Sequence, residues 1–375
     1  MLLVLLGCTA PTRPAPPPPP DACAIMRTPA PGPKAVDIAQ RIDRPIEVAR
    51  LRVEEARLTG DPGFYTLAEQ ALDCAQKDGS DDPEAVRLRA HVLVQFHQFA
   101  EAERLLLPLA QQTESWQDRM LLGDALMEQG KLTDAAVAYQ KAMDARPGLP
   151  LYDRAGWLRW LTGDLPGAIE MQQLAVQAGS PTDPEPFAWV LTRLGWLHAL
   201  SGAPSPELDA ALRLIPDYKP ALFARGRVRL HAGDPAAASD LTKVGATVEA
   251  VWALTEIDPA ANVHAVGAQD PRGYAMYLSD KEPERAVALL KEELTVRQDA
   301  VTHVAHAYAS FRAGATADAA AEARAALGTG IIEPRTLLQG GLLLQDPALL
   351  KQALAMGPGL LPSERRQAED ALKSN

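Results

Sequence analysis

The chain has 375 residues, of which 47% are hydrophobic and only 5% aromatic, and its formal net charge is -11. This length allows two or three ordinary domains or one long array of repeats. The negative charge argues against a nucleic acid as the main partner, because binding to phosphate backbones requires a basic surface.

The first eight residues, MLLVLLGC, form a short apolar run that ends in Cys8. The run resembles the end of a bacterial lipoprotein signal peptide, in which a small residue precedes the modified cysteine. The resemblance implies that residues 1–7 are removed and that a diacylglycerol is attached to Cys8. No positive residue precedes the run, and the run is short for a signal peptide, which leaves open a natural start upstream of Met1. The alternative is a fortuitous apolar N-terminus on a cytosolic protein.

Residues 8–36 comprise this cysteine and a proline-rich stretch, TAPTRPAPPPPPDACAIMRTPAPGPKAV. Consecutive prolines favour an extended polyproline II path, so we expect a semi-rigid spacer between a membrane and a folded body. An SH3-type ligand is the alternative interpretation. Cys23 lies in this stretch and Cys74 on an expected early helix. In an oxidising compartment the two thiols would be able to form a disulfide, and two free thiols are equally compatible with the sequence.

Residues 116–147, WQDRMLLGDALMEQGKLTDAAVAYQKAMDARP, place small residues at set intervals in a helical pattern. Gly123 would let two antiparallel helices cross closely, and Gly130 suits the turn between them. The segment resembles the tetratricopeptide repeat, W-x2-L-G-x2-Y…A-x3-F…P. The matching positions are Leu122, Gly123, Leu126, Ala135, Tyr139 and Pro147. Arg119 departs from the pattern, since the family usually has tryptophan there, and this predicts a looser seam.

The same two markers recur along the chain. The small residue at the helix crossing recurs as Ala90, Gly123, Gly156, Gly195 and Gly226, at intervals of 33, 33, 39 and 31 residues. The turn glycine recurs as Gly130, Gly163, Gly202 and Gly233. One helix pair cannot bury its apolar face alone, so the resemblance implies a stacked array. We therefore predict an all-α, right-handed α-solenoid over residues 37–375.

The regular spacing has two exceptions. Between about residues 243 and 298 the spacing weakens, and the sequence leaves open whether this region forms one repeat or two. At the C-terminus, PSERRQAEDALKSN is polar with an amphipathic rhythm. We expect it to form the capping helix that stops a solenoid from associating through its open end.

The sequence contains none of the common catalytic or nucleotide-binding motifs. Gly130-Lys131 superficially resembles a phosphate loop, but Leu132 stands where serine or threonine is required. His303 and His306 are three residues apart on one helix face, and no carboxylate or cysteine lies near them in sequence. We therefore expect no catalytic site, no cofactor and no metal.

In tetratricopeptide repeats the first helix of each pair lines the concave side. The aromatic and charged residues that fall on this face are Trp157, Trp160, Trp189, Trp196, Phe223, Arg227, Tyr308 and Phe311. Four of the six tryptophans are in this set. A partly exposed aromatic strip is suited to binding a peptide or helix, with Asp153 and Arg227 orienting it. Packing between neighbouring first helices is the alternative role of the same residues.

Two functional hypotheses follow. In the first, the protein is a non-enzymatic scaffold that binds a partner protein in the aromatic groove and is held by Cys8 in the bacterial envelope, on the periplasmic side of the outer membrane. In the second, it is a cytosolic tetratricopeptide repeat scaffold whose first residues are miscalled.

Overall fold

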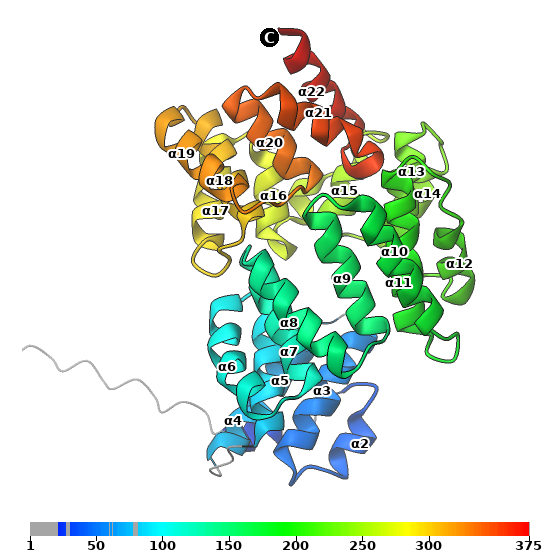
Figure 1. Ribbon diagram of the computed structural model, residues 1–375, viewed down its shortest axis with the longest axis vertical. Helices are drawn as coiled ribbons and strands as arrows, with labels where there is room; N and C mark the ends of the chain where they lie inside the picture. The colour runs from blue at the N-terminus through cyan, green and yellow to red at the C-terminus, as the bar shows by residue number, and fades with distance from the viewer. Residues whose placement is uncertain (1–21, 28–30, 60, 62, 78–81, 375) are drawn as a thin grey trace, which may run out of the picture. The chain divides into compact units, whose positions relative to one another are not determined.

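The computed structural model describes residues 22–27, 31–59, 61, 63–77 and 82–374, and these residues form α-helices and short 3-10 helices with no strand. The expected all-α class of helix–turn–helix pairs is confirmed (Figure 1). The chain divides into two compact units, Met1–Val92 and Leu93–Asn375. The expected signal peptide at residues 1–7 and the modified Cys8 lie outside the described residues.

The first unit is a small helical body. Its helices are α1 (Ala22–Met26), α2 (Ala35–Ala39), α3 (Pro45–Thr59) and α4 (Gly63–Lys77), and α5 (Pro83–Gln95) begins in it and ends in the second unit. Helix α1 packs on α4, where Cys23 forms a disulfide with Cys74. Residues 22–26 are therefore folded and do not follow the extended path predicted for the proline-rich stretch. The physical reason is local, since this segment, ACAIM, contains no proline.

The second unit contains four successive helix pairs. They are α7 (Trp116–Glu128) with α8 (Leu132–Ala145), α9 (Leu149–Leu161) with α10 (Leu165–Ala178), α11 (Pro184–Leu200) with α12 (Pro206–Leu214), and α13 (Lys219–His231) with α14 (Ala237–Val244). Helix α6 (Phe99–Gln112) packs on α7 before them. The sequence predicts these pairs well because each is made by local signals.

The local signals are small residues at the helix crossings and glycines in the turns, and the structure shows why each is needed. A Cβ atom added at Gly123 would lie 2.4 Å from the Tyr139 ring, so only glycine allows α7 and α8 to cross this closely. Gly130 and Gly163 end their turns with φ angles of 73° and 91°, a left-handed conformation that favours glycine. The crossing and turn positions predicted from spacing therefore have the geometry that the pattern requires.

Residues 243–298, where the repeat spacing weakens in the sequence, form an irregular arrangement in the structure. It contains α15 (Val248–Leu254), the 3-10 helices η1 (Val263–Ala265) and η2 (Gly267–Gln269), and one pair, α16 (Pro271–Leu278) with α17 (Pro283–Glu293). Regular pairs return as α18 (Ala300–Arg312) with α19 (Thr316–Leu327) and α20 (Pro334–Leu344) with α21 (Pro347–Ala355). The chain ends with η3 (Gly357–Gly359) and α22 (Pro362–Ser374).

The end of the chain returns to earlier helices of the second unit. Helix η3 packs against α11 and α13, and Leu361 is buried in one apolar core with Trp252 and Leu230. The backbone N–H of Ile332 donates to the Leu161 carbonyl at 2.9 Å, which joins the loop before α20 to the end of α9. The second unit is therefore held by contacts between distant pairs as well as between neighbours.

Candidate functional site

Helices α9 and α11 present an aromatic and charged cluster that we call the Trp–Arg stack, made by Trp157, Trp189 and Arg193. The Arg193 guanidinium carbon lies 3.7 Å from the centre of the Trp157 ring and 5.1 Å from that of Trp189. Trp189 and Arg193 are four residues apart on α11, so they share one face of the helix. Trp189 is 36% exposed, the most open of the expected groove residues in this cluster.

Asp153 on α9 holds the stack in place. Its carboxylate accepts a hydrogen bond from Trp189 Nε1 at 3.1 Å and one from Arg193 Nε at 3.2 Å. It also accepts one from Gln172 Nε2 of α10 at 2.8 Å. Burial alone raises the pKa of Asp153, but Arg193 and the hydrogen bonds from Gln172 and Trp189 outweigh burial and hold the pKa below its usual range. Asp153 is therefore a charged support beneath the stack, and its buried position keeps it from orienting a ligand directly as the sequence had indicated.

Two other expected groove residues lie on the same two helices as the stack. Trp160 is buried, and its ring centre is 4.2 Å from that of Trp157. Trp196, two turns beyond Trp189 on α11, is half-buried. Trp160 is thus a packing residue, as the alternative interpretation allowed, whereas Trp157, Trp189 and Trp196 keep exposed surface.

The chain itself covers the next part of the expected strip. Arg227 on α13 is buried and donates through Nη2 to the carbonyl oxygens of Pro358 and Gly359 at 2.9 and 3.0 Å. Its guanidinium carbon lies 5.8 Å from the ring centre of the half-buried Phe223. Arg227 therefore binds η3 of its own chain, and it is not available to orient a partner as the sequence predicted.

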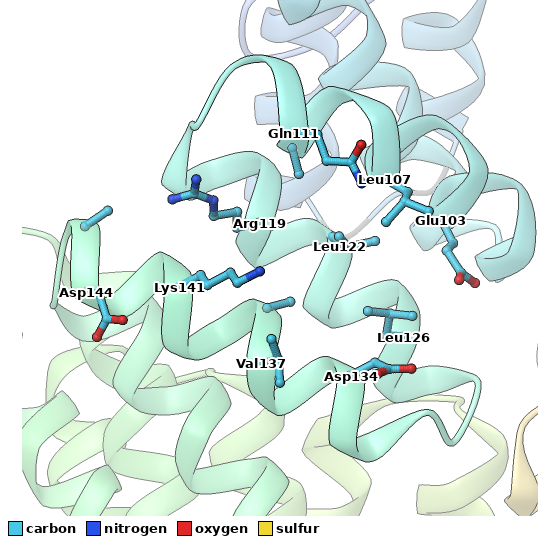
Figure 2. A pocket seen from close by; sticks show the side chains of 13 residues that line it. Glu103, Leu107, Gln111, Arg119, Leu122, Leu126, Asp134, Val137, Lys141 and Asp144 are labelled. Carbon is cyan, nitrogen blue, oxygen red and sulfur yellow. The ribbon is translucent and has the colours of Figure 1, made fainter.

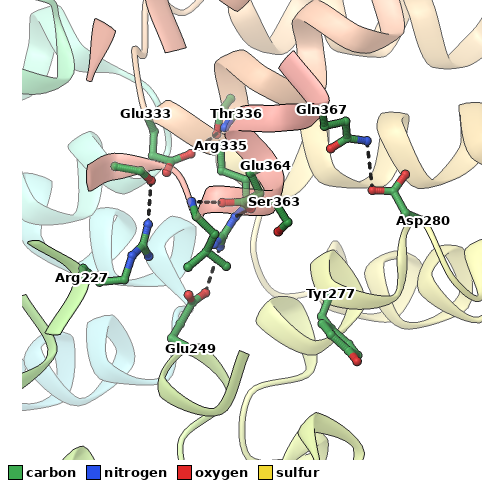
Figure 3. A network of polar contacts seen from close by, with 12 residues as sticks. Arg227, Glu249, Tyr277, Asp280, Glu333, Arg335, Thr336, Ser363, Glu364 and Gln367 are labelled. Carbon is green, nitrogen blue, oxygen red and sulfur yellow. Dashed lines mark hydrogen bonds and ion pairs between the residues drawn. The ribbon is translucent and has the colours of Figure 1, made fainter. Parts of the chain in front are cut away.

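Figure 3 shows how the C-terminal segment is fixed there. Arg335 of α20 donates to Glu364 of α22 at 2.6 Å and to Glu249 of α15 at 3.1 Å, and it lies 4.0 Å from the Trp252 ring centre. Burial lowers the pKa of Arg335, but the two carboxylates raise it more, so the guanidinium stays charged. Arg335 of α20 therefore pairs with the C-terminal helix through Glu364 and with α15 through Glu249, so one buried guanidinium links the three helices.

The last two expected groove residues also belong to this packed region. Tyr308 is 2% exposed, donates to Asp280 at 2.7 Å and accepts from Gln367 Nε2 of α22 at 3.0 Å. Phe311 is half-buried beside the apolar cluster formed by α18 and α19. The structure therefore brings Trp157 and Trp189 together through Arg193, whereas Tyr308 contacts α22 and Phe311 packs on the cluster of α18 and α19.

The two histidines on α18 have a partner that sequence distance concealed. Nδ1 of His303 and Nδ1 of His306 each lie 2.8 Å from one carboxylate, that of Glu322 on α19. Among the described residues no group of three histidine, cysteine or acidic side chains is arranged to hold a metal ion. Similarly, no helix in the part of the chain that the structure describes is both long and apolar enough to cross a membrane.

Sequence reasoning missed Arg193, Gln172 and the position of the C-terminal segment. Arg193 could have been predicted from the sequence, since it follows Trp189 by four residues on a helix already assigned to the groove. Gln172 could not have been predicted, because nothing in the sequence distinguishes it from any other glutamine on the second helix of a pair. The sequence gives no indication that Pro358 lies beside Arg227, which is 131 residues away.

Residues 35–150 match the family described as a tetratricopeptide repeat-like domain. A tetratricopeptide repeat-containing protein from Cytophaga hutchinsonii, solved as its C-terminal part, is 18% identical, with 67% of this chain and 95% of that chain covered and a TM-score of 0.35. Yeast Tom70 is 12% identical, with coverages of 94% and 95% and a TM-score of 0.40. A tetratricopeptide repeat protein from Parabacteroides merdae is 14% identical, with coverages of 78% and 97% and a TM-score of 0.25. No curated protein matches the chain significantly.

Proposed function

Since the chain carries a tetratricopeptide repeat-like domain, of a family that typically forms non-enzymatic scaffolds, we propose that it is a protein-binding scaffold of the bacterial envelope. Its partner inserts an apolar segment against the Trp–Arg stack on α9 and α11. Proteins with stacked helical repeats present extended surfaces of this kind to their ligands.

One observation carries the binding part of the proposal, namely the exposed indole of Trp189 held rigidly by buried polar groups. Asp153 fixes both Trp189 and Arg193 through hydrogen bonds of 3.1 and 3.2 Å. A large aromatic surface that is already ordered loses little conformational entropy on binding, and tryptophan and arginine are enriched among residues that dominate binding energy. Arg193 also offers its remaining N–H groups to a carbonyl or carboxylate of the partner.

The disulfide supports the envelope part of the proposal. Disulfides persist in oxidising compartments such as the periplasm and are rare in the cytosol, and Cys23 is joined to Cys74. The lipobox-like run that ends at Cys8 supplies the membrane anchor in this proposal. The alternative of a cytosolic scaffold would leave both cysteines in a reducing environment.

Substitution of the stack tests the binding site. A pull-down from a bacterial envelope fraction identifies the partner, and its affinity is then measured for the Trp189→Ala and Trp157→Ala variants. Each should weaken binding by about 2 kcal/mol, because a well-buried aromatic anchor is lost. The matched control is Trp116→Ala, which removes an indole at the start of α7 that lies beside Arg146 and not Arg193. Folded stack variants that bind as tightly as this control would exclude the stack from the interface.

A separate experiment tests the anchor. Metabolic labelling with an alkyne fatty acid should modify the wild-type protein and leave a Cys8→Ser variant unlabelled. Fractionation should then place the wild-type protein in the membrane and the variant in the soluble periplasm. Equal labelling of the two proteins, or no labelling of either, would remove the lipid anchor from the proposal without affecting the binding site.

A further inference from the structure

Helices α6, α7 and α8 form a groove with a volume of about 870 Å³ (Figure 2). Helix α7 provides its floor through Leu122 and Leu126, which are almost completely buried. Leu107 of α6 and Val137 of α8 stand on its two walls. This groove lies between second helices of the array, so it is separate from the Trp–Arg stack on the first helices α9 and α11.

Arg119 explains why the groove occurs at this pair. It lies four residues before the crossing glycine, Gly123, and it lines the groove. The residues at the same distance before the other crossing positions are Val86, Tyr152, Leu191 and Leu222. Only this pair therefore carries a charged side chain where the others carry an apolar one that would fill the seam. The looser seam predicted from sequence corresponds to an open groove in the structure.

Two apolar side chains on the walls of the groove are unusually exposed to solvent. Leu107 is 48% exposed and Val137 is 49% exposed, although leucine and valine are usually buried in a folded protein. Both side chains border the same groove, so they form one apolar strip across it. An exposed apolar strip bordered by charged residues is typical of a binding surface.

The charges of the groove indicate which ligand it accepts. Arg119 and Lys141 lie at the same end of the groove as Asp144 in Figure 2, and neither cation forms an ion pair with a described residue. The Asp144 carboxylate accepts a hydrogen bond from Gln140 Nε2 at 2.7 Å. The other end carries Asp134 and Glu103, and Glu103 is already paired with Lys131 at 2.6 Å. In a chain with a net charge of -11, an end of the groove where two unpaired cations outnumber one carboxylate is complementary to the carboxylates of a ligand.

We propose that this groove binds an acidic, leucine-containing peptide segment of a second partner protein. The leucines of the segment pack between Leu107 and Val137, and its aspartate or glutamate side chains pair with Arg119 and Lys141. The volume of about 870 Å³ accommodates a few side chains rather than a folded domain, which favours a short linear segment. The scaffold then carries two binding surfaces with different chemistry.

Fluorescence anisotropy with short labelled peptides tests the proposal on the full chain. The first probe alternates leucine with aspartate, the second replaces each aspartate by lysine, and the third replaces each leucine by alanine. Only the first should bind measurably, and added salt should weaken it because part of the attraction is between exposed charges. Failure of the first peptide to bind, or equal binding of the lysine peptide, would overturn the proposal.

Matched variants assign the binding to the groove. Arg119→Gln with Lys141→Gln should weaken binding of the acidic peptide at least about tenfold, and Val137→Ser should weaken it severalfold. The control, Arg213→Gln with Lys351→Gln, removes the same charge from exposed positions outside the groove and should leave affinity unchanged. Equal losses in the two charge-matched variants would show that the peptide responds only to net charge. Circular dichroism confirms that each variant retains its helices.

Discussion

Close crossing of helices depends on single glycines whose removal has a calculable steric effect. A Cβ atom added at Gly226 would lie 2.9 Å from two carbon atoms of Leu241, closer than such atoms approach in folded proteins. Both residues are buried, so α13 and α14 would have to separate. We expect Gly226→Ala to lower the free energy of unfolding by about 1–3 kcal/mol, even though alanine favours helix formation. Urea denaturation followed by circular dichroism measures the change.

A glycine in open space provides the control for this prediction. Around Gly148, the residue before α9, an added Cβ atom would meet only Pro150 Cδ at 4.0 Å. We therefore expect Gly148→Ala to change the unfolding free energy by less than about 0.5 kcal/mol. If both substitutions had the same effect, the close crossing would not be what requires glycine at position 226.

A second residue-scale prediction concerns pH and the carboxylate of Glu322. Burial raises its pKa, but hydrogen bonds from His303 and His306 lower it to about 2, and the same contacts raise the pKa of His303 above 6.5. The stabilisation from Glu322 is present above its ordinary pKa of 4.5 and is lost as pH falls toward 2. That from His303 is present below 6.5 and is lost as pH rises through its raised pKa.

The interaction therefore stabilises the fold most between pH 4.5 and 6.5. Glu322→Gln should lower the Tm more at about pH 5.5 than at about pH 8.5, because His303 loses its charge as the pH rises through its raised pKa. Differential scanning fluorimetry at both pH values measures this difference. Glu170→Gln, a substitution at an exposed position on α10, should show no such dependence. An equal loss of Tm at both pH values would contradict the prediction.

At the scale of elements, the disulfide joins α1 to α4 across 51 residues. Closing a loop of this length restricts the unfolded chain, which stabilises the native state by roughly 2–4 kcal/mol. We expect the double substitution Cys23→Ser with Cys74→Ser to lower the melting temperature of the first unit. Limited proteolysis should then cut near α1 in the variant and not in the wild type. Mass spectrometry under non-reducing conditions verifies the bridge in the wild-type protein.

The buried ion pairs of Arg335 make a separate prediction for α22. Removal of the guanidinium by Arg335→Ala would leave Glu364 and Glu249 without their cation, so we expect a loss of about 3–5 kcal/mol. Hydrogen exchange should show faster opening of α22. By contrast, Arg366 of α22 pairs with Glu256 through a guanidinium that is 66% exposed, so its substitution by alanine should cost less than about 1 kcal/mol. Similar losses in both variants would mean that the buried network does not hold the helix.

The sequence predicted elements where local markers repeat and failed where they stop. Pairs such as α7 with α8 follow from Gly123 and Gly130, which act within a few residues of themselves. Between residues 243 and 298 no pair of crossing and turn glycines occurs, and the structure contains a short helix, two 3-10 helices and one pair there. Placing α22 required knowledge of the contact between Ser363 and Glu256, which are 107 residues apart. Periodicity carries no information about contacts at that distance.

On the scale of the whole molecule, the candidate site was predicted in part. Spacing placed Trp157, Trp189 and Trp196 on one face, because the first helices repeat with nearly the same length. It also placed Arg227 and Tyr308 there, and these residues bind η3 and α22 instead. This error has a physical cause. Periodicity predicts which side chains lie on the same face of the array, but it does not predict that a distant segment of the chain covers that face.

The bonds from Arg227 to the carbonyl oxygens of Pro358 and Gly359 have a consequence for how the protein is made. The donor and its acceptors are 131 and 132 residues apart, so α13 emerges from the ribosome long before its partner segment. At ordinary translation rates of about 5–20 residues per second this delay lasts roughly 7–26 s. Throughout that interval a guanidinium destined for burial and the adjacent face of Phe223 remain in water. During synthesis, chaperones and proteases therefore have access to a surface that is covered in the completed protein.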